Sequence, residues 1–148
     1  MQKKLYSDKD AAKGLIDVRI KLSALWVSMM MLYIYADILS LFRPGQLEEI
    51  QKGMMGPIEV SQISLLAASA VVIIPAVMIF LSLVLKPKVN RWTNIILGTL
   101  FIFVNFGNLL GEQWVYYIVF GILELAIAAL IVRYARTWPQ SSTPTSAT

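Results

Sequence analysis

The stretch WVYYIVFGILELAIAALIV, residues 114–132, decides the fold class of this chain. It holds 19 residues, of which only Glu124 is charged. A helix needs about 20 mostly apolar residues to cross the hydrocarbon core of a bilayer. The stretch therefore predicts a membrane-spanning helix that keeps one carboxyl group well inside the membrane.

Three more stretches of this kind precede it, at about residues 22–42, 63–85 and 92–110. Proline and glycine interrupt helices, and such breaks separate the stretches at 43–45, 86–88 and 111–113. We therefore expect an all-α fold, a four-transmembrane-helix bundle formed by residues 22–134. The first apolar stretch is longer than the 7–15 residues of a signal peptide, and we expect it to be retained.

The composition supports a membrane protein and excludes several kinds of chemistry. Hydrophobic residues make up 57% and charged residues 15% of the chain, against roughly 45–50% and about 25% in soluble domains. Cysteine and histidine are both absent, which removes disulfides, thiolate metal sites, the usual haem ligand and the usual neutral-pH base. The sequence therefore predicts no metal site and no cofactor.

The basic residues predict the orientation of the helices. Eleven of the 13 Lys and Arg residues precede the first span, follow the last, or lie between the second and third spans. Only Arg43 and Lys52 lie on the other side. Because cytoplasmic loops collect positive charge, we expect a multi-pass protein of the plasma or inner membrane with both termini in the cytoplasm. This distribution explains the net charge of +4, and nucleic-acid binding is not expected.

The segments outside the bundle are predicted as follows. Residues 1–21 form a cytoplasmic segment, in which 10–21 is an amphipathic helix on the membrane surface or an inward extension of the first span. Residues 135–148 end in a Ser/Thr/Pro-rich run and are predicted to be a disordered cytoplasmic tail.

The long connection after the first span is predicted to contain a short extracytoplasmic amphipathic helix. Pro44 suits a first helical turn, and Leu47, Ile50 and Met54 follow with helical spacing. Gly53 or Gly56 could end this helix. An ordered surface loop is the alternative.

Two acids, Asp37 and Glu124, lie within the predicted spans, where a charge costs a few kcal/mol. Helical spacing places each of them on a stripe of polar and small residues, and a third stripe carries Asn105 and Asn108. We expect the stripes to face inward and to form a polar pocket that opens outward, with Asp37, Glu124, Asn105, Asn108 and Tyr33 as its ligand-binding residues. The stripes comprise Met30, Tyr33, Asp37 and Ser40; Asn94, Gly98, Phe101, Asn105 and Asn108; and Tyr117, Gly121, Glu124 and Ala128.

A structural role for these polar residues is the alternative. Asn residues in membrane helices often only form hydrogen bonds across an interface, worth roughly 0.6 kcal/mol each. For Glu124, with no Lys or Arg inside the spans, we expect a neutral carboxyl group that donates a hydrogen bond to Asn105, Tyr33 or a backbone carbonyl.

Two further features concern the helices themselves. Pro75 cannot donate a hydrogen bond to the carbonyl of Val71, so the second span is predicted to kink. Aromatic residues near the span ends predict a belt at the two membrane surfaces: Trp26, Trp92, Trp114, Tyr134 and Trp138.

The string YADILSL at 35–41, followed by Pro44-Gly45 and Glu49-Ile50, resembles a family of small bacterial four-helix membrane proteins of unknown function. The run VNRWTNI at 89–95 and Glu124 agree with this resemblance, which covers about residues 18–138. A more distant likeness to DoxX-like membrane proteins concerns topology alone. The resemblance implies a fold and brings no activity with it.

Two functions stay open. The first is a pocket that binds or translocates a small polar or cationic ligand or protons, with a homodimer to complete a pathway. The second is an accessory or scaffold subunit of a membrane complex, in which the polar stripes bind a partner membrane subunit. An intramembrane enzyme is not favoured, because no nucleophile–base pair, phosphate loop or metal cluster is visible.

Overall fold

The computed structural model describes residues 2–138, and their side chains from Val18 onward. Among these residues, four helices are long and apolar enough to span a membrane, so the predicted all-α four-helix bundle is confirmed. The strands β1 and β2 form one small antiparallel hairpin. The elements in order are α1 (Gln2–Ser40), α2 (Gln46–Gln51), β1 (Met54–Met55), β2 (Ile58–Glu59), α3 (Gln62–Val84), α4 (Pro87–Leu109) and α5 (Val115–Arg136).

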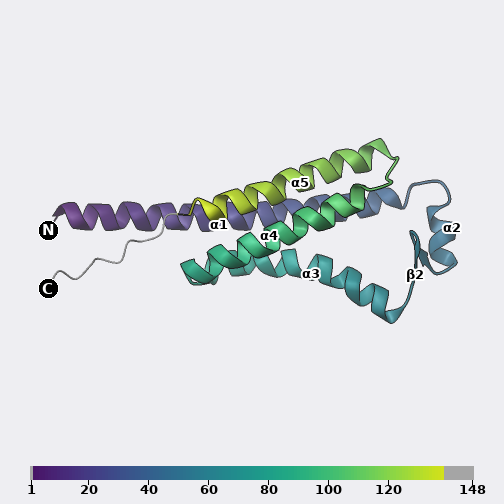
Figure 1. Cartoon of the computed structure of the whole chain (residues 1–148), viewed down its shortest axis with the longest axis horizontal. Helices are drawn as coiled ribbons and strands as arrows, with labels where there is room; N and C mark the ends of the chain where they lie inside the picture. The colour runs from purple at the N-terminus through teal and green to yellow at the C-terminus, as the bar shows by residue number, and fades with distance from the viewer. Residues whose placement is uncertain (1, 139–148) are drawn as a thin grey trace.

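The long helices form a bundle that is closed at one end. Helix α4 packs along α5, while α5 and α3 both pack on α1, and α3 meets α4 only over a short stretch. Helix α2 and the β-hairpin lie together at one end of the bundle (Figure 1), which we call the hairpin end. The turn between α3 and α4 lies at the opposite end, called here the turn end.

The spans differ from the prediction mainly at their ends. Helix α4 begins at Pro87 rather than Trp92, because proline needs no hydrogen-bond partner for its nitrogen in a first helical turn. Helix α5 continues to Arg136, since Ala135 is still buried in the bundle. The tail predicted to be disordered from residue 135 thus begins with helix, and 139–148 lie outside the described residues. At the other terminus, α1 forms one continuous helix, as expected if the segment before the first span extends it.

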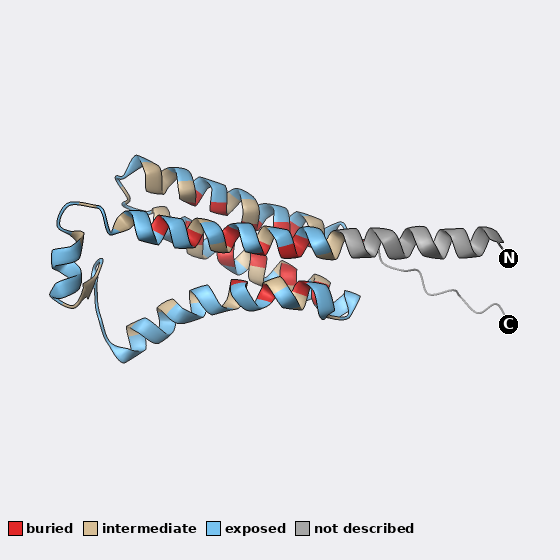
Figure 2. Ribbon diagram, turned by 180° about the vertical axis from the view of Figure 1, so that it is seen from behind, coloured by how far each residue is buried: buried red, intermediate tan, exposed pale blue. Residues whose placement is uncertain are grey.

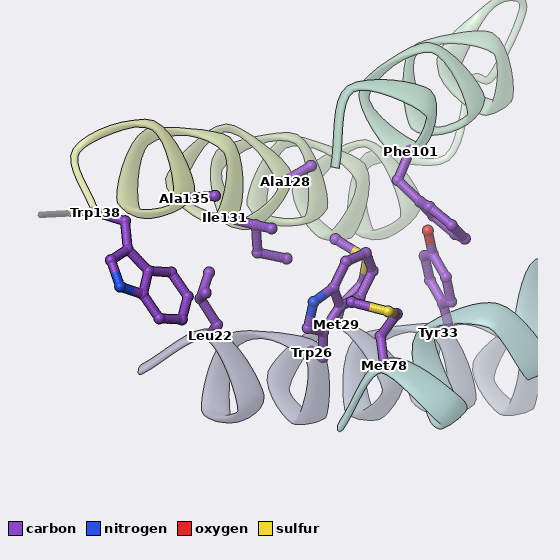
Figure 3. Packing of buried hydrophobic residues seen from close by; sticks show 10 residues of the cluster. All are labelled: Leu22, Trp26, Met29, Tyr33, Met78, Phe101, Ala128, Ile131, Ala135 and Trp138. Atoms are coloured by element: carbon purple, nitrogen blue, oxygen red, sulfur yellow. The ribbon is translucent and has the colours of Figure 1, made fainter. Parts of the chain in front are cut away.

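The core lies in the half of the bundle near the turn end. Trp26 of α1 meets Phe101 of α4 edge to face, with ring centroids 5.7 Å apart, and Met29, Met78 and Ile131 are buried around them (Figure 3). Aromatic pairs of this geometry add about 0.5–1.5 kcal/mol beyond burial. This packing fixes α1, α3, α4 and α5 against one another.

The predicted aromatic belt is wrong for Trp26 and Trp138, and stays a prediction for Trp92, Trp114 and Tyr134. Trp92 and Trp114 are exposed on the helix surface, but Trp26 is 0% and Trp138 is 4% exposed. Both buried rings belong to the core cluster because the apolar interior accepts an indole ring as readily as the membrane surface does. The position of a tryptophan near a span end therefore did not show whether its ring lies in the bundle core or on the outer surface of the bundle.

A buried polar network joins α1, α3 and α4 near the turn end. The indole N–H of Trp26 donates to Asn94 Oδ1 at 2.8 Å, and Asn94 Nδ2 donates to Asn90 Oδ1 at 2.6 Å. Asn90 Nδ2 donates to the backbone carbonyl of Ser82 at 2.6 Å. All four residues are fully buried. The asparagines thus connect helices, as the structural alternative expected for this residue type.

The buried face of α1 differs from the predicted polar stripe. Met30, Asp37 and Ser40 lie beside this face, and Asp37 is exposed. Helix α1 is apolar on most of its sides, so its sequence does not define which side packs. The buried residues of α1 are instead Leu22, Ser23, Trp26, Met29, Tyr33 and Ala36.

Pro75 separates two parts of helix α3 that differ in burial. From Gln62 to Ile74 none of its residues is buried, whereas Pro75, Met78 and Ser82 are. The half of α3 nearer the hairpin end diverges from the other helices (Figure 2). This bend agrees with the kink predicted from the missing hydrogen bond to Val71.

The connection after α1 contains a shorter helix than predicted. Gly45 (φ +83°) precedes α2 and Gly53 (φ +77°) follows it, and both adopt the left-handed conformation that glycine allows without strain. Met54, predicted on the helix, instead lies in β1, opposite Glu59. Helix α2 ends before the turn at Gly53, so Met54 lies outside the helix.

Close packing of α4 on α5 requires Gly98, and we predict that Gly98→Leu lowers the free energy of unfolding by about 2 kcal/mol, as overpacked cores typically do. A Cβ atom at this position would lie 2.9 Å from Val132 Cγ2 and 3.1 Å from Ile131 Cγ2. Equilibrium unfolding in mixed micelles measures the change. Gly107→Leu is the matched control, because nothing lies within 4 Å of a Cβ there. An equal loss in both variants would contradict the prediction.

Candidate functional site

A cavity of about 420 Å³ lies between the helices toward the hairpin end. Four of the five residues predicted as ligand-binding line it: Tyr33, Asp37, Asn108 and Glu124. The fifth, Asn105, is buried outside the lining. The remaining lining residues are Ala36, Met55, Ile58, Ala67, Ala68, Val71, Val72 and Tyr117. The structure thus brings acids from α1 and α5 to one cavity.

Glu124 is the most deeply placed acid of the cavity. It lies on α5, is 5% exposed, and lines the cavity wall. One turn earlier Gly121 lies against Leu109 of α4, so the two helices approach closely beside Glu124. Among the described residues, no hydrogen bond or ion pair reaches its carboxyl oxygens. The carboxyl group therefore has unused capacity for a ligand.

Asp37 lies on the more open side of the same cavity. It follows Ala36, the last residue of the buried face of α1, and is itself exposed. The Ser40 hydroxyl donates to the backbone carbonyl of Asp37 at 2.6 Å, so this hydroxyl does not occupy the Asp37 carboxylate. The two acids thus differ in depth along one cavity.

Tyr33 connects the cavity to the buried residues behind it. Its hydroxyl group donates to Asn105 Oδ1 at 2.5 Å, and Asn105 Nδ2 is buried without a hydrogen-bond partner within the described chain. The predicted hydrogen bond from Glu124 to Asn105, Tyr33 or a backbone carbonyl is not formed within the described chain, and the Tyr33 hydroxyl pairs with Asn105. Tyr33 still reaches the cavity, while Asn105 acts behind it by orienting the Tyr33 hydroxyl.

The apolar side of the cavity was not predicted from the sequence. Ala67, Ala68, Val71 and Val72 of α3 form one wall. These residues form two adjacent pairs one turn apart, so they share one helix face with small side chains. That pattern could have predicted which face of α3 lines the cavity. The β-hairpin contributes the rest of this side, and nothing in its sequence predicted strands two residues long.

A cation–aromatic cluster at the hairpin end, which we call the Arg43 cluster, was not predicted from the sequence either. The Arg43 guanidinium lies 5.5 Å, 5.1 Å and 4.9 Å from the ring centroids of Trp114, Tyr116 and Tyr117. Its Nη1 and Nη2 each donate to Glu112 Oε2 at 3.2 Å, and its Nε donates to the Tyr116 hydroxyl at 2.7 Å. The signal available in the sequence was the opposite charge of Arg43, which follows the first span, and Glu112, which lies between the third and fourth spans. The cluster ties the end of α1 to the turn between α4 and α5.

The environment of Glu112 favours its charged form. Burial alone would raise the pKa of Glu112, but backbone N–H groups of Trp114 and Gln113 and the charge of Arg43 hold it below the ordinary value of 4.5. The two N–H groups donate to Oε1, each at 2.9 Å. Glu112 is therefore the acid that neutralises Arg43, which leaves this arginine unavailable to the cavity acids.

The donor set of the cavity restricts what it can hold. Within the described part of the chain, no group of three or more His, Cys, Asp or Glu side chains could hold a metal ion. Two carboxyl groups, two tyrosines and one asparagine suit hydrogen bonding and charge pairing with a small ligand.

The four long apolar helices define a multi-pass membrane protein. The chain belongs to a family of unknown function, DUF6326, which matches residues 16–145. This membership agrees with the resemblance to an uncharacterised family of membrane proteins. No curated protein and no solved structure matches the chain.

Proposed function

We propose that this chain is a plasma-membrane protein with both termini in the cytoplasm and the hairpin end outside. The support is the distribution of basic residues, eleven of which flank the turn end and the termini, because positive charge collects on the cytoplasmic side. In this orientation α2 is extracytoplasmic, and the cavity lies in the outer half of the membrane.

The proposed function is to bind or translocate a small polar or cationic ligand, or protons, at the cavity shared by Asp37 and Glu124. One observation carries the proposal: Glu124 is 5% exposed and lines a cavity, yet no described residue pairs with its carboxyl group. Polar groups buried in a membrane protein are normally paired with one another or with a ligand. A ligand or a transferred proton supplies the missing partner.

Glu124→Gln is expected to weaken binding of a small cation about ten- to hundredfold, because a hydrogen bond to a charged group contributes about 1.5–3 kcal/mol. Methylammonium and guanidinium are suitable probes, measured by isothermal titration calorimetry on the purified protein. A second measurement, decay of an imposed pH gradient in proteoliposomes, detects proton transfer, which the same substitution is expected to abolish.

Glu59→Gln is the matched control. Glu59 lies on the hairpin beside the cavity, outside its lining, so its substitution should leave both measurements unchanged. If Glu124→Gln binds both cations and dissipates the gradient as the unsubstituted chain does, the cavity is not the functional site. That outcome would favour the scaffold alternative.

A further inference from the structure

The charged residues that line the cavity are all acidic. Of the residues that line it, Asp37 and Glu124 are acids, and none is Lys or Arg. The nearest arginine along α1, Arg43, is paired with Glu112 and covered by aromatic rings. Within the described chain, the cavity lining offers no cation to pair with the carboxylate form of either acid. A positively charged occupant would supply that partner and favour the carboxylate form.

The walls of the cavity are mostly apolar. Seven of the lining residues are Ala, Val, Ile or Met, and two more are tyrosines. A bare inorganic cation takes most of its ligands from oxygen, six to eight of them for Ca²⁺, and these walls offer few. An organic cation carries its own apolar surface, which such walls can bury at about 25 cal/mol per Å². The lining therefore suits an organic cation better than a metal ion.

The tyrosine rings add a second attraction for such a cation. An ammonium or guanidinium group is attracted to an aromatic face within about 6 Å. Tyr33 and Tyr117 both line the cavity. The Tyr117 ring lies 4.9 Å from the Arg43 guanidinium, whereas no cation of the described chain lies over the Tyr33 ring.

The side of the cavity between α3 and α4 is weakly closed. The described hydrogen bonds from side chains that tie α3 to other helices involve Ile79, Ser82 and Leu83, all beyond Pro75 toward the turn end. The other half of α3 has no buried residue and diverges from α4 and α5 (Figure 2). Met55 and Ile58 of the hairpin line the end of the cavity. The weakly closed side is thus the one that faces the apolar phase in which an amphiphile dissolves.

We propose that the cavity binds a monovalent organic cation with an apolar body, whose charge lies at Asp37 and Glu124 and whose body lies against α3. This inference rests on the function proposed above and names its ligand class. Three related probes separate the two features of such a ligand. Benzyltrimethylammonium has charge and apolar body, tetramethylammonium has the charge alone, and neopentylbenzene has the same shape as the first with carbon in place of nitrogen.

The experiment measures binding of each probe to the full chain in lipid nanodiscs by calorimetry. Benzyltrimethylammonium is expected to bind about ten- to hundredfold more tightly than tetramethylammonium, because burying a phenyl ring contributes about 1.5–3 kcal/mol. Neopentylbenzene is expected to bind at least about tenfold more weakly than its cationic counterpart, since it lacks a charge-assisted contact. Asp37→Asn and Glu124→Gln should each weaken binding of the cation, and Glu59→Gln should not.

The absence of native cysteine allows the site to be located. In Ala68→Cys, benzyltrimethylammonium at ten times its Kd should slow reaction with N-ethylmaleimide about tenfold by occupancy. Ala70→Cys is the control, since Ala70 lies on α3 outside the lining, and its labelling should not change. Equal protection of both cysteines would overturn the assignment of the site.

The remaining outcomes separate this inference from the function on which it rests. If tetramethylammonium or methylammonium binds as tightly as benzyltrimethylammonium, the ligand class is wrong while a Glu124-dependent site stands. If neopentylbenzene binds as tightly, charge plays no part in binding and the ligand class is wrong, and the Glu124→Gln measurements alone then decide the proposed function. If no probe binds and no proton transfer depends on Glu124, both proposals fail. Because the three-probe comparison uses the unsubstituted chain, it decides the ligand class even where a variant does not fold.

Discussion

Asn94→Leu is expected to lower the free energy of unfolding by about 2–4 kcal/mol, the sum of several buried hydrogen bonds at roughly 0.6–1.7 kcal/mol each within a membrane. Asn94 accepts from the Trp26 indole at 2.8 Å and donates to the side chain and the backbone carbonyl of Asn90 at 2.6 and 2.9 Å. Leucine has the same branching and the same number of side-chain heavy atoms, so the loss comes mainly from the polar groups left unpaired. Equilibrium unfolding in mixed micelles measures it.

The matched control for Asn94→Leu is Asn108→Leu. Asn108 belongs to the same helix but is exposed, and no hydrogen bond to its side chain is formed within the described chain. Its substitution should change stability by less than about 0.5 kcal/mol, as surface substitutions usually do. Equal stability of Asn94→Leu and the unsubstituted chain would contradict a structural role for the network.

The four spans were predictable because each is a long apolar run, a property that does not depend on the rest of the fold. Helix α4 was also predictable in its orientation, since Asn94, Phe101 and Asn105 stand out on one side of it and are all buried. Helix α1 was not, because apolar residues surround it and both Ala36 and Asp37 could have faced inward. Lipid accepts the same side chains as a protein core, so hydrophobicity cannot separate packed faces from lipid-facing ones.

The candidate site was predictable in its acids and not in its walls. Asp37 and Glu124 stood out because charges are rare within spans. The contribution of Met55 and Ile58 depends on a hairpin with two-residue strands, too short to leave an alternating pattern. The Arg43 cluster depends on contacts between residues about 70 positions apart, which no local pattern encodes. Charge within an apolar run was therefore the most informative signal in this sequence.

Arg43→Ala is expected to lower the free energy of unfolding by about 2–3 kcal/mol. The substitution removes the ion pair with Glu112, in which the Arg43 and Glu112 side chains are only 16% and 13% exposed. It also removes three cation–aromatic contacts, worth about 0.5–1 kcal/mol each at accessible sites. Arg43→Lys should recover only part of the loss, because an ammonium group cannot form the same planar set of hydrogen bonds. Unfolding in mixed micelles at neutral pH measures both variants.

The pH dependence of this loss separates the ion pair from the aromatic contacts. The pKa of Glu112 in the folded protein lies below its ordinary value of 4.5, so the unfolded chain binds the proton more readily and stability is gained above that value. The contribution is lost as the pH falls through the lowered pKa. The difference in stability between the unsubstituted chain and Arg43→Ala should therefore shrink on acidification below about pH 4.5, leaving the aromatic part. A difference that stays constant from neutral to acid pH would mean that the three rings, and not Glu112, hold Arg43 in place.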